Sequence, residues 1–179
     1  MKLILIKHAM PVIDTSVAPP EWELSDEGRS AAEQLGQELS GRRIAAIVSS
    51  EEPKAAGTAA AVAGVLDLPW STAPGLHEHV RRVMPWSGQE AWHALLQRFF
   101  ERPDELVFGE ETGSEALERF SGAVAAVSNT LDPDSGTLCI VSHGTVMSLF
   151  AARQLEVPPY SIWAGLRLPD YVELELVAD

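Results

Sequence analysis

The chain has 179 residues, and 13 Lys and Arg stand against 26 Asp and Glu, so its formal charge is −13 when the histidines are neutral. This excess of acid argues against a broad surface for nucleic acid or an anionic membrane, because both need cations that face phosphates. The length fits one domain over residues 1–179. A composition of 46% hydrophobic and 22% charged residues is typical of a soluble globular protein with a sizeable core.

The N-terminal apolar run is too short for a signal-peptide core or a membrane span, and no later stretch is long enough to cross a bilayer. We therefore expect a cytoplasmic protein. Cys139 is the single cysteine, which excludes an intramolecular disulfide and leaves too few soft ligands for a structural zinc site. It lies in an apolar run, where we expect a small buried core residue rather than a reactive thiol.

The first half of the chain alternates strand and helix patterns. Residues 3–6 form a continuous apolar run, which predicts a strand covered on both faces, and a similar run follows at 44–48. Between them, Ser25 is the predicted N-cap of a helix whose first turn is acidic. An Ala-rich stripe predicts a second helix over residues 51–66.

The second half continues this alternation. A third apolar strand is predicted at 137–141, helices at 89–100, 114–131 and 145–154, and an alternating edge strand at 171–176. Residues 69–88, rich in Pro and Trp, form the one long irregular stretch, which we interpret as an insertion over the active face rather than a second domain. Together the elements predict an α/β fold with a mostly parallel central sheet between helical layers.

Polar clusters follow three of the predicted strands. Ligands of open α/β sheets bind beyond the carboxyl ends of the strands, where helix N-termini offer free N–H groups. We therefore expect two imidazoles and two ammonium groups at one rim of the sheet. This set suits a phosphoryl group, since the cations neutralise its oxygens while an imidazole attacks phosphorus. The four residues are Lys7, His8, Lys54 and His143.

Five sequence blocks resemble the histidine phosphatase superfamily, which includes the phosphoglycerate mutases. They occur in the family's order, which is far more specific than any one block. Lys7-His8-Ala9 resembles Arg-His-Gly, Leu24-Ser25-Asp26-Glu27-Gly28 resembles Leu-Thr-x-x-Gly, and residues 49–59 resemble Ser-Ser-Pro-Leu-x-Arg-Ala-x-x-Thr-Ala. Leu76-His77-Glu78 is similar to Leu-x-Glu, and Ser142-His143-Gly144 matches Ser-His-Gly.

The resemblance implies a phosphoglycerate mutase-like three-layer α/β/α sandwich and a role for each matched residue. His8 would attack phosphorus and carry a transient phosphohistidine, and His143 would stabilise the charge on the equatorial oxygens. Glu78 would protonate the leaving oxygen and then activate water, which requires a carboxyl group with a raised pKa. The phosphate would be held by Lys7, Lys54 and the backbone N–H of Thr145. No metal or organic cofactor is expected.

The sequence departs from this pattern at the phosphate site. Both family arginines are lysines here, and an ammonium group is a point charge that lacks the planar fork of a guanidinium. Ala9 would add a methyl group where the backbone approaches phosphate. Asp14 stands where many members have Asn; it either points inward, toward a lysine or as a second acid, or is an ordinary loop residue, and we favour the loop residue.

Other polar residues near these blocks have two interpretations each. Glu51 and Glu52 replace the family's Pro-Leu pair, where they would satisfy the helix dipole and also weaken the attraction of a highly charged substrate. His77, His79, Arg81 and Arg82 either line the mouth of the site or form surface pairs, and a metal site at the histidines is disfavoured by their spacing. We expect His93 to be half-buried packing.

The preferred hypothesis is a phosphatase that hydrolyses a small phosphomonoester of modest charge. The chain is short for a mutase, so hydrolysis is favoured over transfer, while phosphohistidine or phosphoprotein substrates stay open. The alternative is a weak or inactive relative that binds a phosphorylated or other anionic ligand, or acts as an interaction module. Retention of both histidines argues against the alternative, because such a relative needs no nucleophile.

Overall fold

The structure is a computed structural model that describes residues 1–82 and 88–176, and it contains one five-stranded sheet in the order β3-β2-β4-β1-β5. All strand pairs are parallel except β1 with β5. The strands are β1 (Lys2–Lys7), β2 (Ile44–Ser49), β3 (Trp70–Thr72), β4 (Thr137–Ser142) and β5 (Asp170–Glu175). The predicted mostly parallel sheet and its edge strand are confirmed.

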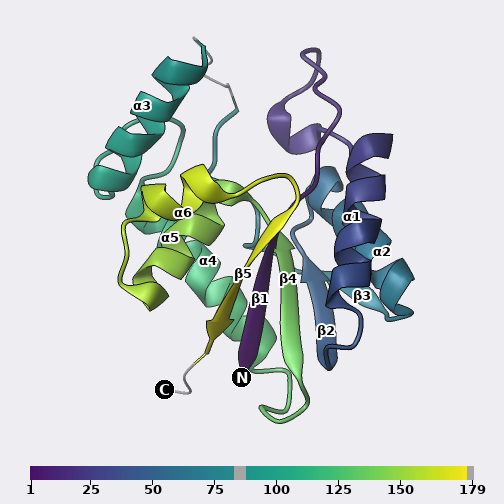
Figure 1. Ribbon diagram of the computed structural model, residues 1–179. Coiled ribbons are helices and arrows are strands. Elements are labelled where there is room, and N and C mark those ends of the chain that lie inside the picture. The colour runs from purple at the N-terminus through teal and green to yellow at the C-terminus, as the bar shows by residue number, and fades with distance from the viewer. Residues whose placement is uncertain (83–87, 177–179) are drawn as a thin grey trace.

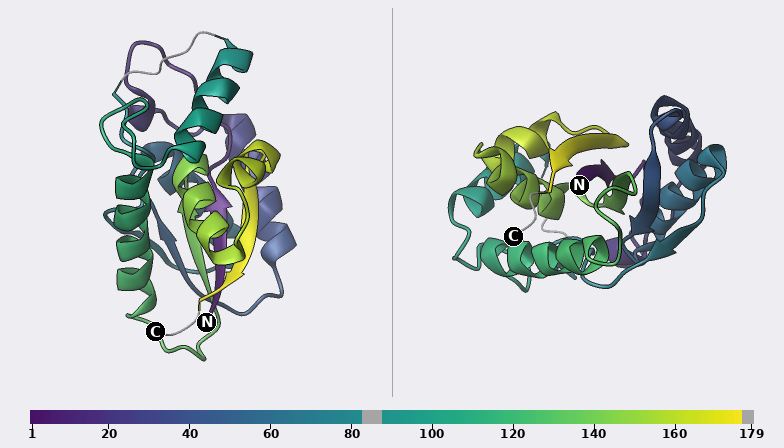
Figure 2. Two further views of the ribbon diagram at one scale, coloured as in Figure 1. Left: turned by 90° about the vertical axis from the view of Figure 1, so that its left-hand side faces the viewer. Right: turned by 90° about the horizontal axis from the view of Figure 1, so that it is seen from below.

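Helices cover both faces of the sheet (Figures 1 and 2). One face carries α1 (Asp26–Leu39) and α2 (Pro53–Leu66), which pack on each other, and the other face carries α4 (Gly113–Ser128) and α5 (Gly144–Leu155). Beyond these lie α6 (Pro159–Gly165), which packs on α5, and α3 (Gln89–Glu101), which extends past the carboxyl ends of the strands. The predicted α/β/α sandwich is therefore confirmed.

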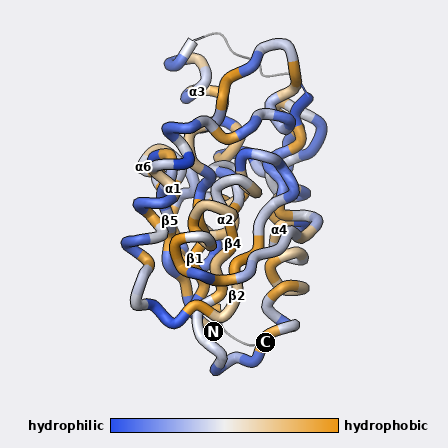
Figure 3. The backbone as a smooth tube through the Cα atoms, turned by 90° about the vertical axis from the view of Figure 1, so that its right-hand side faces the viewer, coloured by the Kyte–Doolittle hydropathy of each residue, from blue (hydrophilic) through white to orange (hydrophobic). Residues whose placement is uncertain are grey.

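The alternation of side chains along the central strands builds the two cores. Leu3 and Leu5 of β1 face the α4 and α5 side, whereas Ile4 and Ile6 face α1 and α2. The central strands are accordingly hydrophobic along their length (Figure 3). Cys139 is fully buried in the core beneath α1 and α2, where burial raises the pKa of its thiol to about 12. The expected inert core cysteine is thus confirmed.

The start of α1 ties the loop after β1 to the body of the protein. Ser25 is the N-cap, as predicted, and its Oγ accepts from the Gly28 amide at 2.9 Å and donates to the Met10 carbonyl at 2.8 Å. A Cβ atom at Gly28 would lie 2.2 Å from that same carbonyl oxygen, so this position requires glycine. Residues 8–25 are therefore held over the end of the sheet.

Three elements were not predicted. The short strand β3 lies in the segment 69–88 that we expected to be irregular, so that part of the prediction was wrong; residues 83–87 of the segment lie outside the described chain. A 3-10 turn at Pro19–Glu21 and helix α6 are also new, and α4 ends at Ser128 rather than 131. In the parts of the chain described here, no helix has the length and apolarity needed to cross a membrane.

Candidate active site

The carboxyl ends of β1, β2 and β4 are joined by backbone hydrogen bonds that continue past the strands. The His8 amide donates to the Ser142 carbonyl at 2.9 Å, and the Ser50 amide donates to Val141 at 2.9 Å. The Ser142 hydroxyl donates to the Leu76 carbonyl at 2.7 Å and so anchors the loop that precedes Glu78. Three loops are thereby fixed around one depression.

His8 and His143 lie side by side, with ring centroids 5.2 Å apart and planes inclined by 60°. Nδ1 of His8 donates to the Ala9 carbonyl at 2.8 Å, which fixes the tautomer and leaves the lone pair on Nε2. Burial, followed by the nearby His143, lowers the pKa of His8 to about 3. His8 is therefore a neutral imidazole at physiological pH, as a nucleophile must be.

His143 is fully buried at the N-terminus of α5. Its Nε2 lies 2.9 Å from the Ser50 hydroxyl and 3.5 Å from Oε1 of Glu52, whereas Nδ1 has no hydrogen-bond partner among the residues described. Burial holds the pKa of His143 well below its usual value. One side of the ring is thus anchored, and Nδ1 on the other side is buried without a partner among the residues described.

The two lysines reach the same depression from opposite sides. Nζ of Lys7 donates to the Leu166 carbonyl at 3.0 Å, and Nζ of Lys54 donates to the Pro19 carbonyl at 2.8 Å. Lys7 packs against Gly144, where a Cβ atom would lie 3.2 Å from its Cε. Burial lowers the pKa of Lys7, an effect that the nearby Glu78 and Asp170 oppose.

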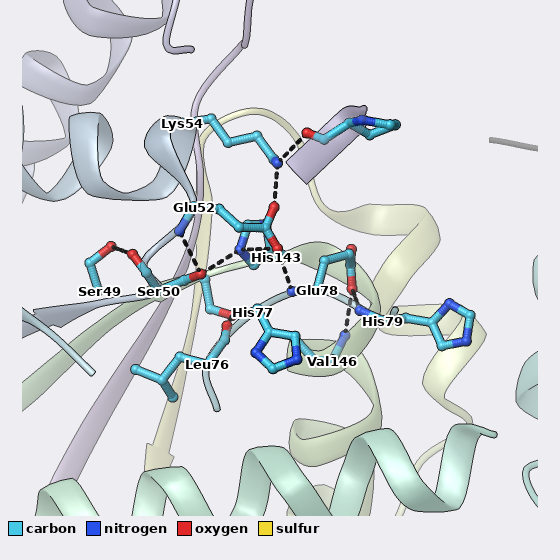
Figure 4. A network of polar contacts seen from close by, with 12 residues as sticks. Ser49, Ser50, Glu52, Lys54, Leu76, His77, Glu78, His79, His143 and Val146 are labelled. Atoms are coloured by element: carbon cyan, nitrogen blue, oxygen red, sulfur yellow. Dashed lines mark hydrogen bonds and ion pairs between the residues drawn. The ribbon is translucent and has the colours of Figure 1, made fainter. Parts of the chain in front are cut away.

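Glu52, which the sequence analysis placed only at a helix start, lies in the site itself (Figure 4). Its side chain is only 10% exposed, and its Oε2 accepts from Nζ of Lys54 at 2.5 Å. Its Oε1 accepts from the Glu78 amide at 2.9 Å and lies beside His143. Glu52 therefore neutralises one of the two lysines inside the pocket.

Glu78 lies over the first turn of α5. Its carboxylate accepts from the amides of His79 at 2.8 Å, Thr145 at 3.2 Å and Val146 at 3.3 Å. Burial favours the neutral acid, but Arg81, His143 and these amides outweigh it and lower the pKa of Glu78. The expected raised pKa is thus wrong for this unliganded arrangement, in which Glu78 occupies the Thr145 amide that we assigned to phosphate.

These side chains line a cavity of about 240 Å³. Three cations and two carboxylates contribute to its wall, so its net charge is one positive unit when the imidazoles are neutral; they are Lys7, Lys54, Arg81, Glu52 and Glu78. The rest of the wall is mostly apolar and includes Met10, Pro11, Ile13, Pro19, Trp22, Trp92, Trp163 and Leu168. A small anion with an apolar substituent would match this lining.

Two residues suspected of disturbing the site lie away from it. Asp14 is exposed and accepts from the Ser16 amide and hydroxyl at 2.8 and 2.6 Å, as expected for an ordinary loop residue. The methyl group of Ala9 is buried against α2, and its amide donates to Thr58 at 3.0 Å. Our expectation that Ala9 crowds the phosphate is therefore wrong.

Two of the three remaining histidines, His79 and His93, are packing residues, and the third, His77, is half-buried outside the cavity. His79 is buried between Phe99 and Phe108, with ring centroids 4.7 Å away in each case, and its Nε2 donates to the Glu111 carbonyl at 2.8 Å. His93 is half-buried against Trp163, as expected. Within residues 1–82 and 88–176, no group of three or more His, Cys, Asp or Glu side chains is arranged to hold a metal ion.

The fold and the paired histidines define an α/β protein with a candidate active site at the carboxyl edge of its sheet. The chain matches the model of the histidine phosphatase superfamily (branch 1) over residues 3–176, and it belongs to that family. No curated protein sequence matches it significantly.

Solved structures share the fold at low sequence identity. A mycobacterial glucosyl-3-phosphoglycerate phosphatase has a TM-score of 0.73 at 21% identity, covering 96% of this chain and 88% of its own. Bacillus stearothermophilus YhfR has a TM-score of 0.69 at 22% identity, covering 91% and 84%. A phosphoserine phosphatase variant from Entamoeba histolytica, in complex with phosphoserine, has a TM-score of 0.68 at 20% identity, covering 96% and 89%.

Proposed function

We propose that the protein hydrolyses a small phosphomonoester through a phosphohistidine on His8. The observation that carries this proposal is the pairing of a neutral, tautomer-fixed His8 with a buried His143 whose Nδ1 has no partner among the described residues. The two ring centroids lie 5.2 Å apart, in a cavity of net positive charge. Membership of the histidine phosphatase superfamily, and solved neighbours that are phosphatases, support the same reaction.

In the first step, the Nε2 lone pair of His8 attacks phosphorus as the bond to the leaving oxygen breaks. His143 and Lys7 stabilise the charge on the transferring oxygens. The leaving oxygen takes a proton from Glu78. In the second step, Glu78 accepts a proton from water, the water oxygen attacks phosphorus, and the P–N bond breaks to release phosphate and neutral His8.

Glu78 must be protonated before it can act as the acid. In the unliganded site it is an anion held by three amides. A substrate phosphate would compete for the Thr145 amide and add negative charge beside the carboxylate, and both effects raise a carboxyl pKa. Substrate binding itself would therefore bring Glu78 toward the protonated form that the first step requires.

The cavity lining suggests the substrate class. One net positive unit suits a phosphomonoester better than a bisphosphate, and the Trp and Pro side chains around it suit an apolar or aromatic leaving group. For the same reason of charge, we prefer hydrolysis over a phosphomutase reaction, which must hold a bisphosphorylated intermediate. We also propose that the protein is cytoplasmic.

One observation favours a second candidate, a weak or inactive relative that binds a phosphorylated ligand or another anion. Glu52 pairs with Lys54, and Glu78 covers the α5 N-terminus, so both groups oppose an incoming anion. Such a protein would bind phosphate without turning over its esters.

The test is hydrolysis of an aryl phosphate by the wild type, His8→Ala and, as a matched control, His93→Gln, whose histidine lies outside the cavity. Turnover by the wild type and the control, abolished in His8→Ala, supports a phosphatase. A phosphoryl label on the quenched wild type that is stable in alkali and lost in acid would identify the intermediate. Equal background rates in all three proteins would favour the binding protein.

A further inference from the structure

Arg81 enters the cavity from the loop after Glu78, and no part of the proposed reaction uses it. Its side chain is 11% exposed. The guanidinium carbon lies 5.4 Å from the centroid of the Trp92 ring, within the range of a cation–π contact. The side chain is therefore packed on Trp92 at the wall of the cavity.

The hydrogen-bond donors of this guanidinium are incompletely used. In the described part of the chain, Nε and Nη1 are buried and have no partner, and Nη2 approaches Oε2 of Glu78 only at 3.6 Å, longer than a good hydrogen bond. A buried donor without a partner costs about 1–3 kcal/mol, and more in a charged group. Such donors are normally satisfied by water or by a ligand.

Arg119, which contacts the loop that carries Glu78, is an arginine whose hydrogen bonds hold protein structure in place. Arg119 donates to the carbonyls of Gly75, His77 and Glu78 at 2.8 to 3.2 Å, and it pairs with the Glu111 carboxylate through two nitrogens. Its donors hold the loop that carries Glu78 in place. Among the described residues, Arg81 makes no comparable hydrogen bond to the backbone of this loop, because its Nε and Nη1 have no partner and its Nη2 approaches only the Glu78 carboxylate.

We propose that Arg81 is a substrate-binding residue whose Nε and Nη1 bind the phosphoryl oxygens of the substrate. The inference rests on the proposed phosphatase site. Both strand-end cations are lysines, which supply point charges, and one of them is neutralised by Glu52. Arg81 supplies the planar pair of donors that a phosphate binds best. Its packing on Trp92 reduces the side-chain entropy that is lost on binding.

A role through Glu78 alone is the competing explanation, since Arg81 also lowers the pKa of that carboxyl group. The two roles have different signatures. A group that only tunes Glu78 shifts the pH profile of turnover and leaves phosphate affinity unchanged. A group that binds the phosphoryl oxygens changes phosphate affinity at every pH.

The experiment measures the Kd of inorganic phosphate by calorimetry for the wild type, Arg81→Lys, Arg81→Gln and Arg82→Lys. Arg82 is the matched control, because its side chain is 84% exposed and pairs with Glu110 at 3.3 Å. We expect Arg81→Lys to weaken phosphate binding by about tenfold or more, the value of one charge-assisted hydrogen bond, and Arg82→Lys to change it by less than about twofold. Arg81→Gln retains a planar donor group and provides a second measurement if the lysine variant unfolds.

Measuring turnover of an aryl phosphate distinguishes failure of the proposed role of Arg81 from failure of the proposed phosphatase function. Added guanidinium should restore part of the rate lost in Arg81→Ala. Unchanged phosphate binding in both Arg81 variants, or a change confined to the pH profile, overturns the role of Arg81. Weaker binding in these variants together with no turnover by the wild type overturns the phosphatase and leaves Arg81 as the ligand of a phosphate-binding protein.

Discussion

Replacing Glu52 by Gln should make the pocket bind phosphate more tightly. The Glu52 carboxylate touches Lys54 at 2.5 Å and approaches His143 at 3.5 Å, on the side of the imidazole opposite Nδ1. An anion bound at Nδ1 would lie roughly 7 Å from Glu52, and at an effective dielectric constant of about 20 the repulsion between two unit charges there is about 2 kcal/mol. The charge of Lys54 is the same in both proteins, so removing this repulsion should raise phosphate affinity by up to about thirtyfold.

The same substitution should destabilise the fold. Lys54 and the Glu78 amide donate to different oxygens of the carboxylate, and a carboxamide replaces one of these oxygens with an NH2 donor that faces one of the two donors. Removing one partner of a buried ion pair typically costs about 3 kcal/mol. Phosphate affinity and stability should therefore move in opposite directions in Glu52→Gln.

Calorimetry with inorganic phosphate and urea unfolding measure the two effects. Glu51→Gln is the matched control, because it removes the same charge from the exposed neighbouring residue. We expect Glu51→Gln to shift affinity by less than about twofold and stability by less than about 0.5 kcal/mol. Equal gains in phosphate affinity for both variants would show that the effect comes from the net charge of the protein rather than from the position of Glu52. No gain in Glu52→Gln would show that its carboxylate does not oppose phosphate binding.

The ionisation of the site gives three further predictions. Because burial and His143 lower the pKa of His8 to about 3, kcat/KM for an aryl phosphate, corrected for substrate ionisation, should show no acid limb near the ordinary histidine pKa of about 6.5; a rate halved at that pH would contradict this. Below about pH 6.5 the unfolded chain binds protons at His8 and His143, whereas the folded protein keeps both neutral because their pKa values are lowered. Urea unfolding should therefore show that the free energy of unfolding decreases as the pH is lowered below about 6.5, by up to about 1.4 kcal/mol per pH unit for each histidine. His8→Asn should show a shallower decrease. In Glu78→Gln, kcat/KM for alkyl phosphates should fall about 100-fold and that for nitrophenyl phosphate far less, because a nitrophenolate leaving group needs no proton and kcat/KM does not include the later attack of water on the phosphohistidine; equal losses in kcat/KM for both substrates would exclude Glu78 as the acid.

Most of the fold is predictable because long elements carry their own pattern. The apolar runs and the Ser25 cap are local signals, and they identify the sheet and α1 without tertiary information. The strand β3 has no such pattern: its three residues are exposed, and it is defined only by pairing with Ile47 through Ser49 of β2. Helix α6 did carry a signal, since Pro158 and Pro159 stand at its start.

Because ligands of open α/β sheets bind beyond the carboxyl ends of the strands, the sequence predicted that two histidines and two lysines lie at one rim. The structure places all four around the same cavity. The sequence did not predict in which direction the side chains of the loops point. Glu52 follows the pattern of a helix-start acid, yet its extended backbone as the N-cap of α2 directs it inward onto Lys54. A carboxylate in place of an apolar family residue, two positions before a lysine, was the available signal.

The charge of the pocket links these findings to substrate choice. The chain carries −13 overall, and the cavity keeps one net positive unit because Glu52 and Glu78 offset two of its three cations. A bisphosphate would bring about four negative charges into this setting and be opposed by both the local carboxylates and the global field. A monoester brings at most about two, and Arg81 and Lys7 suffice to bind them. We therefore expect the Glu52 carboxylate to weaken phosphate binding in general and to weaken binding of the more highly charged phosphates most.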